Sequence, residues 1–406
     1  MMSEEKSIIK SICLVTMLMF ILLSFSLGKI DFLPIIFGIS SCILIAYSNF
    51  IIKRFFPNGD KYILILSSFI TQFGLVMIYR LNSQNPVRAI KQISYFTVGI
   101  AVYIFLVIFL PEIKKFERFK NTYIVIAILL LASTLFLGRE IKGSRNWIQI
   151  GSFSMQPSEI AKLFLIFYLA SSIKYIKGFK DVLKLSIPVF ICIGLLVIEK
   201  DLGAGLIFFG IFITMLYIGT SNFKYVLIGM LLFSVGVIAS YFIFPHVRVR
   251  IDIWLDPFAY KTGKGYQICQ SLFAIASGGL FGTGLGLGHP EFIPEVHNDF
   301  IFSAICEEFG LLGAIALIIL YLLLIYRGLR NAVYAKDDYS RLVSVGISSM
   351  LAFQIFVVIG GVTKMIPMTG ITLPFVSYGG SSMLLNFICL GILQRISENR
   401  WDVDEQ

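Results

Sequence analysis

Twelve long apolar runs restrict the fold of this chain more than any other feature of its sequence. A run of about 20 apolar residues matches the hydrocarbon thickness of a bilayer. In lipid every backbone polar group must find its hydrogen bond within the span, so each run should be a helix. We predict an all-α polytopic membrane protein with about twelve transmembrane helices. The runs lie at residues 8–27, 31–52, 61–81, 90–111, 121–138, 157–175, 183–199, 202–219, 223–244, 300–326, 341–362 and 374–396.

Composition supports the membrane assignment and excludes several function classes. The chain has 406 residues, of which 57% are hydrophobic and 14% charged, with a mean hydropathy of +0.86. These values are typical of polytopic membrane proteins. The net charge of +10 comes from Lys and Arg in short loops between the runs, so we expect no nucleic-acid partner. The six cysteines show neither zinc-site spacing nor a disulfide framework.

Basic residues also predict the orientation of the chain. With the N-terminus in the cytoplasm, 20 of the 34 Lys and Arg residues face the cytoplasm and 13 face outward, while Lys162 lies within a span. This bias follows the positive-inside rule, and an even number of spans brings the C-terminus to the cytoplasm as well. The one long connection, residues 245–299, then lies on the outer side. Long loops in compact proteins are often functional.

The end of that connection carries an unusual density of carboxyl groups, in EFIPEVHNDFIFSAICEEFG (291–310). Ionisable residues entering lipid are costly and usually mark function. Asp299 is the leading candidate for chemistry, although its position before Phe300 equally suits the N-cap of a helix. Glu295 would share one side with Asp299 if the segment were helical. His297 is more often a structural residue than a ligand, and three histidines cannot build a His-rich metal site.

A second candidate region is GSRNWIQIGSFSMQPSEIAKLFLIF (143–167). Arg145 supplies a cation for phosphate, and Trp147 suits the headgroup level of a membrane. Pro157 is placed at the first turn of a helix, on which Glu159 and Lys162 share one face. A structural ion pair and a functional one are both open readings of Glu159 and Lys162.

Three further stretches contribute candidates. Asp201 in EKDLGAG reads as the N-cap of the next helix, and Arg248 and Arg250 are candidate anion contacts. Residues 265–280 read as an amphipathic segment lying on the membrane, and the glycines that follow allow tight turns near a reacting centre. The stretch at 373–384 predicts a bent helix start beside a cavity, with Ser377 as a candidate substrate-binding residue.

Five of these stretches occur together and in a familiar order. They are NWIQIGSFSMQPSEIAK, KDLGAG, GYQICQSLFAIASGGLFGTGLG, IPEVHNDFIFSAICEEFGLLGA and TGITLPFVSYGGSS. The chain therefore resembles the SEDS family, the group of RodA, FtsW and SpoVE, which are peptidoglycan glycosyltransferases acting with class B penicillin-binding proteins. The resemblance implies a ten-helix core over residues 56–406, with the large outer loop between its seventh and eighth helices. Residues 1–55 are then two additional N-terminal transmembrane helices.

The resemblance also implies roles for particular residues. It places the acidic catalytic residue at Asp299, with Glu295 as its neighbour. It places the substrate-binding elements at Arg145, Trp147, Gln156, Glu159 and Lys162. The sequence departs from the family pattern at Ile293, at Asn298 and at Glu199–Lys200, which leaves the role of the 199–201 turn less defined.

The expected function is polymerisation of lipid II at the outer face of the bacterial cytoplasmic membrane, for cell elongation, division or sporulation. Asp299 would act as general base on the acceptor hydroxyl. Arg145, Lys162, Arg248 or Arg250 would stabilise the departing diphosphate, as would a divalent cation, Mg²⁺ or Mn²⁺. The alternatives are a lipid II flippase or ion-coupled transporter, and a non-catalytic scaffold for a penicillin-binding protein.

Overall fold

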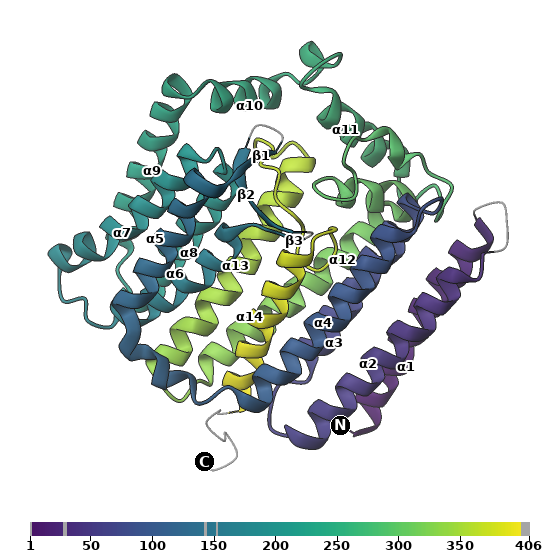
Figure 1. Cartoon of the computed structure of the whole chain (residues 1–406), viewed down its shortest axis with the longest axis horizontal. Helices are drawn as coiled ribbons and strands as arrows, with labels where there is room; N and C mark the ends of the chain where they lie inside the picture. The colour runs from purple at the N-terminus through teal and green to yellow at the C-terminus, as the bar shows by residue number, and fades with distance from the viewer. Residues whose placement is uncertain (1, 27–30, 142–143, 152, 399–406) are drawn as a thin grey trace.

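The computed structural model describes residues 2–26, 31–141, 144–151 and 153–398 (Figure 1). Twelve long helices coincide with the twelve predicted apolar runs, and two shorter helices, α10 and α11, lie in the long connection. The helices are α1 (Met2–Ser26), α2 (Leu33–Phe55), α3 (Tyr62–Leu81), α4 (Val87–Phe109), α5 (Lys120–Leu137), α6 (Pro157–Ile173), α7 (Phe179–Ile198), α8 (Leu202–Thr220), α9 (Phe223–Ile243), α10 (Pro245–Leu255), α11 (Tyr266–Gly278), α12 (Ile301–Val333), α13 (Asp338–Val362) and α14 (Gly380–Glu398).

Ten helices among the described residues are long and apolar enough to cross a membrane, which confirms the polytopic class. The remaining two of the predicted twelve, α6 and α14, fall short by these criteria. Helix α6 has only 17 residues, and α14 carries Asn386, Gln394 and Arg395. Both are largely buried among other helices, so their polar groups need not face lipid.

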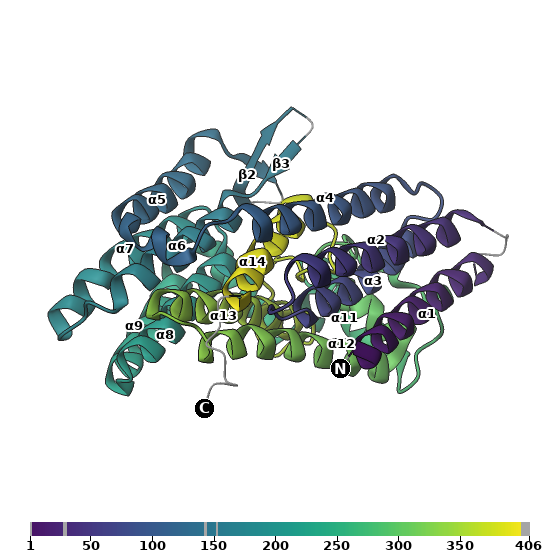
Figure 2. The same ribbon diagram turned by 90° about the horizontal axis from the view of Figure 1, so that it is seen from below.

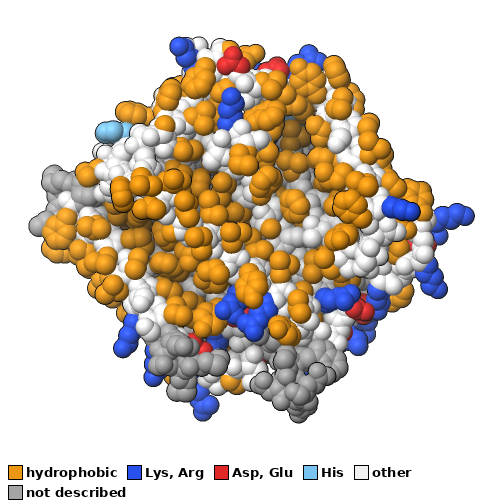
Figure 3. Space-filling view, turned by 180° about the vertical axis from the view of Figure 1, so that it is seen from behind, with side chains coloured by type: hydrophobic (Ala, Val, Ile, Leu, Met, Phe, Trp, Pro, Cys, Tyr) orange, Lys and Arg blue, Asp and Glu red, His pale blue; other side chains and the backbone are white. Residues whose placement is uncertain are grey.

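The core of the bundle is formed by α3, α6, α8, α13 and α14, and the other helices surround it. Helix α13 packs against α6, α8 and α12, while α14 packs against α4. Helix α9, by contrast, lies at the surface of the bundle. Only Gly229 among its 21 residues is buried. Figure 2 shows the helices side by side in a flattened bundle. Figure 3 shows a broad apolar surface across one face, as expected for contact with acyl chains.

The two ends of the bundle differ in their connections. Helix α1 begins and α14 ends toward the lower edge of Figure 1, whereas α10 and α11 follow one another along the upper edge. Residues 245–299 therefore lie at the end of the bundle opposite to the start of α1 and the end of α14. Helix α11 also matches the predicted amphipathic segment, with Ile268, Ala274 and Gly278 buried and Phe273 exposed.

The N-terminal helices form a hairpin that is held against α3 near both of its ends. At one end Lys53 Nζ lies 2.8 Å from a carboxylate oxygen of Glu5, and Lys61 Nζ lies 3.6 Å from the other oxygen. At the opposite end the Tyr79 hydroxyl donates a hydrogen bond to the carboxylate of Asp31. The hairpin thus docks through polar contacts at its ends and apolar contacts between them.

A small antiparallel sheet follows α5 and is absent from the all-α prediction. Its strands are β1 (Arg139–Ile141), β2 (Ser144–Ile150) and β3 (Phe153–Met155), in the order β1-β2-β3. Gln149 pairs with Ser154, and Gly151 in the turn has a φ of +61°, which favours glycine. The strands are too short and too polar to produce a periodic signal in the sequence. They lead directly into α6.

Helix α12 is interrupted at Gly310, where φ is +66° and ψ is −170°. The preceding connection closes this break with backbone hydrogen bonds, since the amides of Thr283 and Gly284 donate to the carbonyls of Glu307 and Glu308 at 2.9 and 3.1 Å. A Cβ on Gly310 would lie 2.3 Å from the Gly282 nitrogen. The predicted tight turns at these glycines are confirmed, but they serve the break in α12, outside the candidate site described next.

Candidate active site

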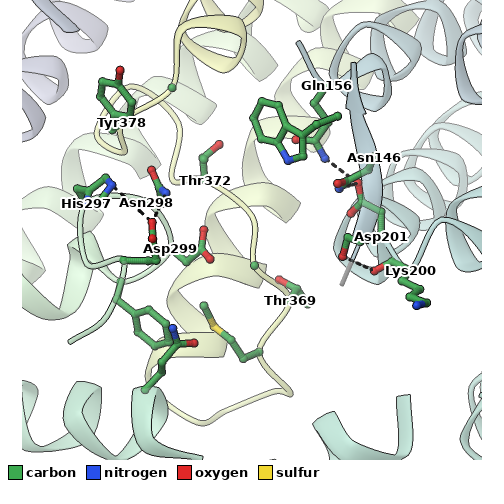
Figure 4. Close-up of a pocket in the computed structure, with 18 of the residues that line it drawn as sticks. Asn146, Gln156, Lys200, Asp201, His297, Asn298, Asp299, Thr369, Thr372 and Tyr378 are labelled. Carbon is green, nitrogen blue, oxygen red and sulfur yellow. Dashed lines mark hydrogen bonds and ion pairs between the residues drawn. The ribbon is translucent and has the colours of Figure 1, made fainter. Parts of the chain in front are cut away.

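A cavity of about 620 Å³ opens where α10, α11 and the β2–β3 hairpin meet the ends of the bundle. Its lining comes from segments far apart in the sequence: α4, the hairpin, the 199–201 turn, α10, the start of α11, and the loops before α12 and α14. Figure 4 shows two opposite walls, one around Asp201 and one around Asp299, with Thr369 and Thr372 between them. Carboxylates from separate elements thus line one cavity.

The first wall is organised by the carboxylate of Asp201. One of its oxygens accepts the Ala204 amide at 3.1 Å, so Asp201 is the N-cap of α8, as predicted. The other oxygen accepts Asn146 Nδ2 at 3.0 Å and Gln156 Nε2 at 2.7 Å. Asp201 therefore fastens the hairpin to the bundle, and the adjacent Lys200, with a φ of +64°, lines the cavity.

The second wall is the turn that precedes α12. Glu295 has a φ of +57°, and the Asn298 amide donates to its carbonyl at 3.0 Å. The segment is therefore a turn and not a helix, so the helical alignment of Glu295 with Asp299 is not realised, although both line the cavity. Helix α12 begins at Ile301 with Phe300 at the N-cap position, one residue later than an Asp299 cap requires.

The loop before α14 holds this turn in place. The Ser377 hydroxyl accepts the Leu373 amide at 2.9 Å and donates to the Asn298 carbonyl. The Tyr378 amide donates to the His297 carbonyl at 2.9 Å. The predicted bend is present, because Phe375 has a φ of +65° and α14 starts only at Gly380. Asp299 is thus positioned by hydrogen bonds to the carbonyls of the two residues that precede it.

The guanidinium of Arg250 lies near the acidic residue of each wall, Asp201 and Asp299. Its side chain extends from α10, and Nη1 donates to the Thr369 carbonyl at 3.2 Å. Burial lowers the pKa of this guanidinium, while the nearby carboxylates of Asp201 and Asp299 oppose that shift. Arg250 lines the cavity, and its guanidinium can bind an anionic group there.

The chain's relationship to known proteins is clear from comparison with sequence families and solved structures. The FtsW/RodA/SpoVE family of cell cycle proteins matches residues 60–401. This chain belongs to that family. The SEDS resemblance seen in the sequence is thereby confirmed, and the match begins after α2.

Individual SEDS relatives agree with this assignment. The peptidoglycan glycosyltransferase RodA of Mycobacterium tuberculosis (strain H37Rv) is 39% identical over 388 residues, covering 89% of this chain and 82% of the relative. Stage V sporulation protein E of Bacillus subtilis (strain 168) is 34% identical over 363 residues, covering 84% and 97%.

Two solved structures share the SEDS fold. One, described as "Structural coordination of polymerization and crosslinking by a peptidoglycan synthase complex", gives a TM-score of 0.75 at 28% identity, covering 85% of this chain and 99% of the matched chain. The crystal structure of RodA from Thermus thermophilus gives a TM-score of 0.65 at 27% identity, covering 85% and 98%.

The predicted site residues of this SEDS protein divide into two groups. Those that line the cavity are Trp147, Gln156, Arg250, Glu295 and Asp299. Those outside the cavity lining, within the described part of the chain, are Arg145, Glu159, Lys162, Arg248 and Ser377. The residues of the second group contact their own surroundings: Arg145 Nε donates to the Gly138 carbonyl at 3.1 Å, and Arg248 lies over the Tyr241 ring.

Glu159 and Lys162 form a buried pair behind the cavity. Lys162 Nζ lies 2.9 Å from Glu159 Oε1 and 2.9 Å from Gln354 Oε1. Gln354 in turn donates to the carbonyl of Thr372, which lines the cavity, at 3.0 Å. The pair is therefore connected to the cavity wall through Gln354.

Sequence reasoning did not single out several residues that line the cavity. Asn146, Lys200, Lys264 and Tyr378 are the main examples. Asn146 lies in the short strand β2 and the other three lie in turns or bends, where periodicity carries little information. The described residues also contain no group of three or more His, Cys, Asp or Glu side chains placed to hold a metal ion.

Proposed function

We propose that this chain is a peptidoglycan glycosyltransferase that polymerises lipid II into glycan strands. The observation that carries the proposal is that Asp299 and the cations of Arg250 and Lys200 line one cavity, in a chain whose relatives bear this activity in their names. A glycosyl transfer from a diphosphate donor needs a base at the acceptor and positive charge at the leaving group. The cavity has both.

The reaction then balances as a single displacement. The acceptor sugar hydroxyl attacks the anomeric carbon of the donor, and Asp299 takes the hydroxyl proton as the new C–O bond forms. The bond from the anomeric carbon to the diphosphate oxygen breaks, and the lipid diphosphate leaves with its electron pair. Arg250 and Lys200, which line the same cavity, would stabilise this charge as it develops. Attack from the face opposite to the leaving group inverts the anomeric centre.

The proposed location is the outer face of the bacterial cytoplasmic membrane, with both chain ends in the cytoplasm. The excess of Lys and Arg in the loops opposite to residues 245–299 supports this orientation. We further propose a class B penicillin-binding protein as partner, because one structural neighbour comes from a peptidoglycan synthase complex. The long prenyl tails would lie against the exposed apolar helices.

The proposal is tested by Asp299→Asn. This change keeps the shape of the side chain but removes the base, and general-base catalysis typically contributes about 10²–10⁴-fold. We expect polymer formation by the purified protein from lipid II to fall by that factor. The control is Asp252→Asn in α10, which lies outside the cavity lining and accepts a hydrogen bond from Tyr241. Near-normal polymerisation by folded Asp299→Asn protein would remove Asp299 from the role.

The geometry favours chemistry over transport. A carrier that uses Lys162 would expose it to a pathway across the membrane. Lys162 is instead 1% exposed and bound to Glu159 and Gln354. A liposome assay separates the two functions: growth of glycan with all lipid II on the outside supports the enzyme, whereas transbilayer movement without polymer supports a carrier.

A further inference from the structure

A second cavity, of about 430 Å³, lies at the opposite end of the bundle from the candidate active site. Three connections form it: the 3₁₀ segment η1 (Ile113–Phe119) before α5, the end of α6, and the turn between α12 and α13. Helix α6 runs from beside Gln156 of the first cavity to Lys174 of the second, a length of about 25 Å. The two cavities are thus separated by roughly the thickness of a bilayer.

The charges of this cavity do not cancel one another. Its carboxylates are engaged within the wall: Glu117 pairs with Lys174, Asp338 lies 3.0 Å from Arg341, and Asp337 caps α13. Asp337 accepts the Ser340 amide at 3.0 Å and the Ser340 hydroxyl at 2.8 Å.

Four cations and three carboxylates line the cavity, so one positive charge is in excess, and two of the cations have no carboxylate partner among the described residues. Lys114 and Lys336 line the cavity and make no ion pair with any residue in the described ranges. Lys114 and Lys336 together offer two ammonium groups to an anion.

The rim of the cavity indicates an amphipathic ligand. The Lys120 and Lys174 ammonium groups lie over the Tyr175 ring at 5.4 and 5.0 Å. Aromatic rings beside basic residues are typical of the headgroup level of a membrane. Next to them, α7 presents Phe179 and Leu183, each more than half exposed, to the surroundings. A ligand with a negative head and apolar tails matches both surfaces.

We propose that this cavity binds the phosphate headgroup of an anionic glycerophospholipid, with Lys114 and Lys336 as its ligands. Basic pockets between helices on the inner side of a membrane are suited to such headgroups. The lipid comes from the leaflet opposite to the one that faces residues 245–299. The site is independent of the proposed polymerase activity, since its measurement uses binding alone.

The experiment uses the full chain in nanodiscs of phosphatidylcholine with a minor fraction of phosphatidylglycerol. Native mass spectrometry then counts the phosphatidylglycerol retained by the released protein. We expect Lys114→Gln/Lys336→Gln to retain about tenfold less than the wild type. The charge-preserving variant Lys114→Arg/Lys336→Arg should retain the wild-type amount. Lys177→Gln/Lys180→Gln removes the same charge from the same end of the bundle outside the cavity lining, and should also leave retention unchanged.

Three outcomes would overturn the proposal. Unchanged retention by Lys114→Gln/Lys336→Gln excludes the site. An equal loss of phosphatidylglycerol in Lys114→Gln/Lys336→Gln and in Lys177→Gln/Lys180→Gln would indicate only a general attraction of the lipid to the basic surface. Binding of inorganic phosphate in detergent that depends on Lys114 and Lys336, without retention of phosphatidylglycerol, assigns the cavity to free phosphate. The single variant Lys336→Gln must lose retention as well, which keeps the test valid if the double variant unfolds.

Discussion

At the scale of single residues, Lys162 shows how a buried charge can serve the site without touching it. Its ammonium group contacts Glu159 and Gln354, and Glu159 Oε2 has no hydrogen-bond partner among the described residues. A buried ion pair is costly to form and still more costly to break from one side. Gln354 transmits the position of this pair to the carbonyl of Thr372. We infer a positioning role for Lys162.

Replacing Lys162 alone should therefore cost stability. Lys162→Met leaves the Glu159 carboxylate buried without its cation, and we expect a loss of about 3–5 kcal/mol in the free energy of unfolding. The double variant Glu159→Gln/Lys162→Met should recover much of that loss. Thermal unfolding of the purified protein in detergent measures both. A stable but inactive Lys162→Met protein would contradict the positioning role and indicate a chemical one.

The buried carboxyl of Glu199, close to Asp201, should make the free energy of unfolding depend on pH. Burial raises the pKa of its carboxyl to about 8 from an ordinary 4.5, the charge of Asp201 adds to the shift, and Thr134 opposes it. The folded state then holds a proton that the unfolded state releases, so stability should fall as pH rises from about 4.5 to 8.

The expected decline is about 2–4 kcal/mol over that range. Glu199→Gln cannot release the proton and should remove this part of the decline. The measurement compares the melting temperatures of the two proteins at pH 5 and pH 8. Parallel pH profiles for wild type and variant would show that Glu199 is not the group responsible.

At the scale of elements, the helices were predictable and their interruptions were not. Apolar length is dictated by the bilayer, so each predicted run matches a helix, and most of the boundaries agree to within a few residues. The break at Gly310 lies inside an unbroken apolar run, where a single glycine is no signal. It is caused by the tertiary contact with residues 279–284, which a local pattern cannot show.

The backbone at Gly310 requires glycine. Gly310→Ala places a Cβ against the Gly282 nitrogen in a conformation with positive φ, so we expect a destabilisation of about 2–4 kcal/mol. Gly236→Ala in α9 is the matched control, since a Cβ there meets no heavy atom within 4 Å. The free energy of unfolding of that variant should stay the same or increase slightly. Equal effects of the two changes on thermal unfolding would refute the requirement.

At the scale of the whole molecule, the candidate site was predicted in part. Asp299 and Arg250 could be found because charged groups beside apolar runs are conspicuous. Asn146, Lys264 and Tyr378 could not, because three separate connections bring them together only in the folded bundle. The β2–β3 hairpin was also not predicted. It is held in place by Asp201, which comes from a turn later in the chain.

The N-terminal hairpin should be separable from the rest of the molecule. Among the described residues, Glu5 contacts Lys61 and Asp31 contacts Tyr79, while the described residues that line the candidate cavity all follow the hairpin. We expect deletion of residues 1–55 to lower the melting temperature but to keep polymerisation within a fewfold of the full chain. Complete loss of polymerisation by a folded, truncated protein would show that the hairpin takes part in the reaction.

The interruption of α12 affects how the protein responds to its lipid surroundings. The piece before Gly310 is only roughly 14 Å long, too short for a bilayer to set its depth. Its depth is instead set by the connection bonded across the break, and Asp299 immediately precedes this piece. Thinner or thicker bilayers should therefore tilt the surrounding helices while the carboxylate keeps its height relative to Asp201, so that turnover tolerates membranes of differing composition.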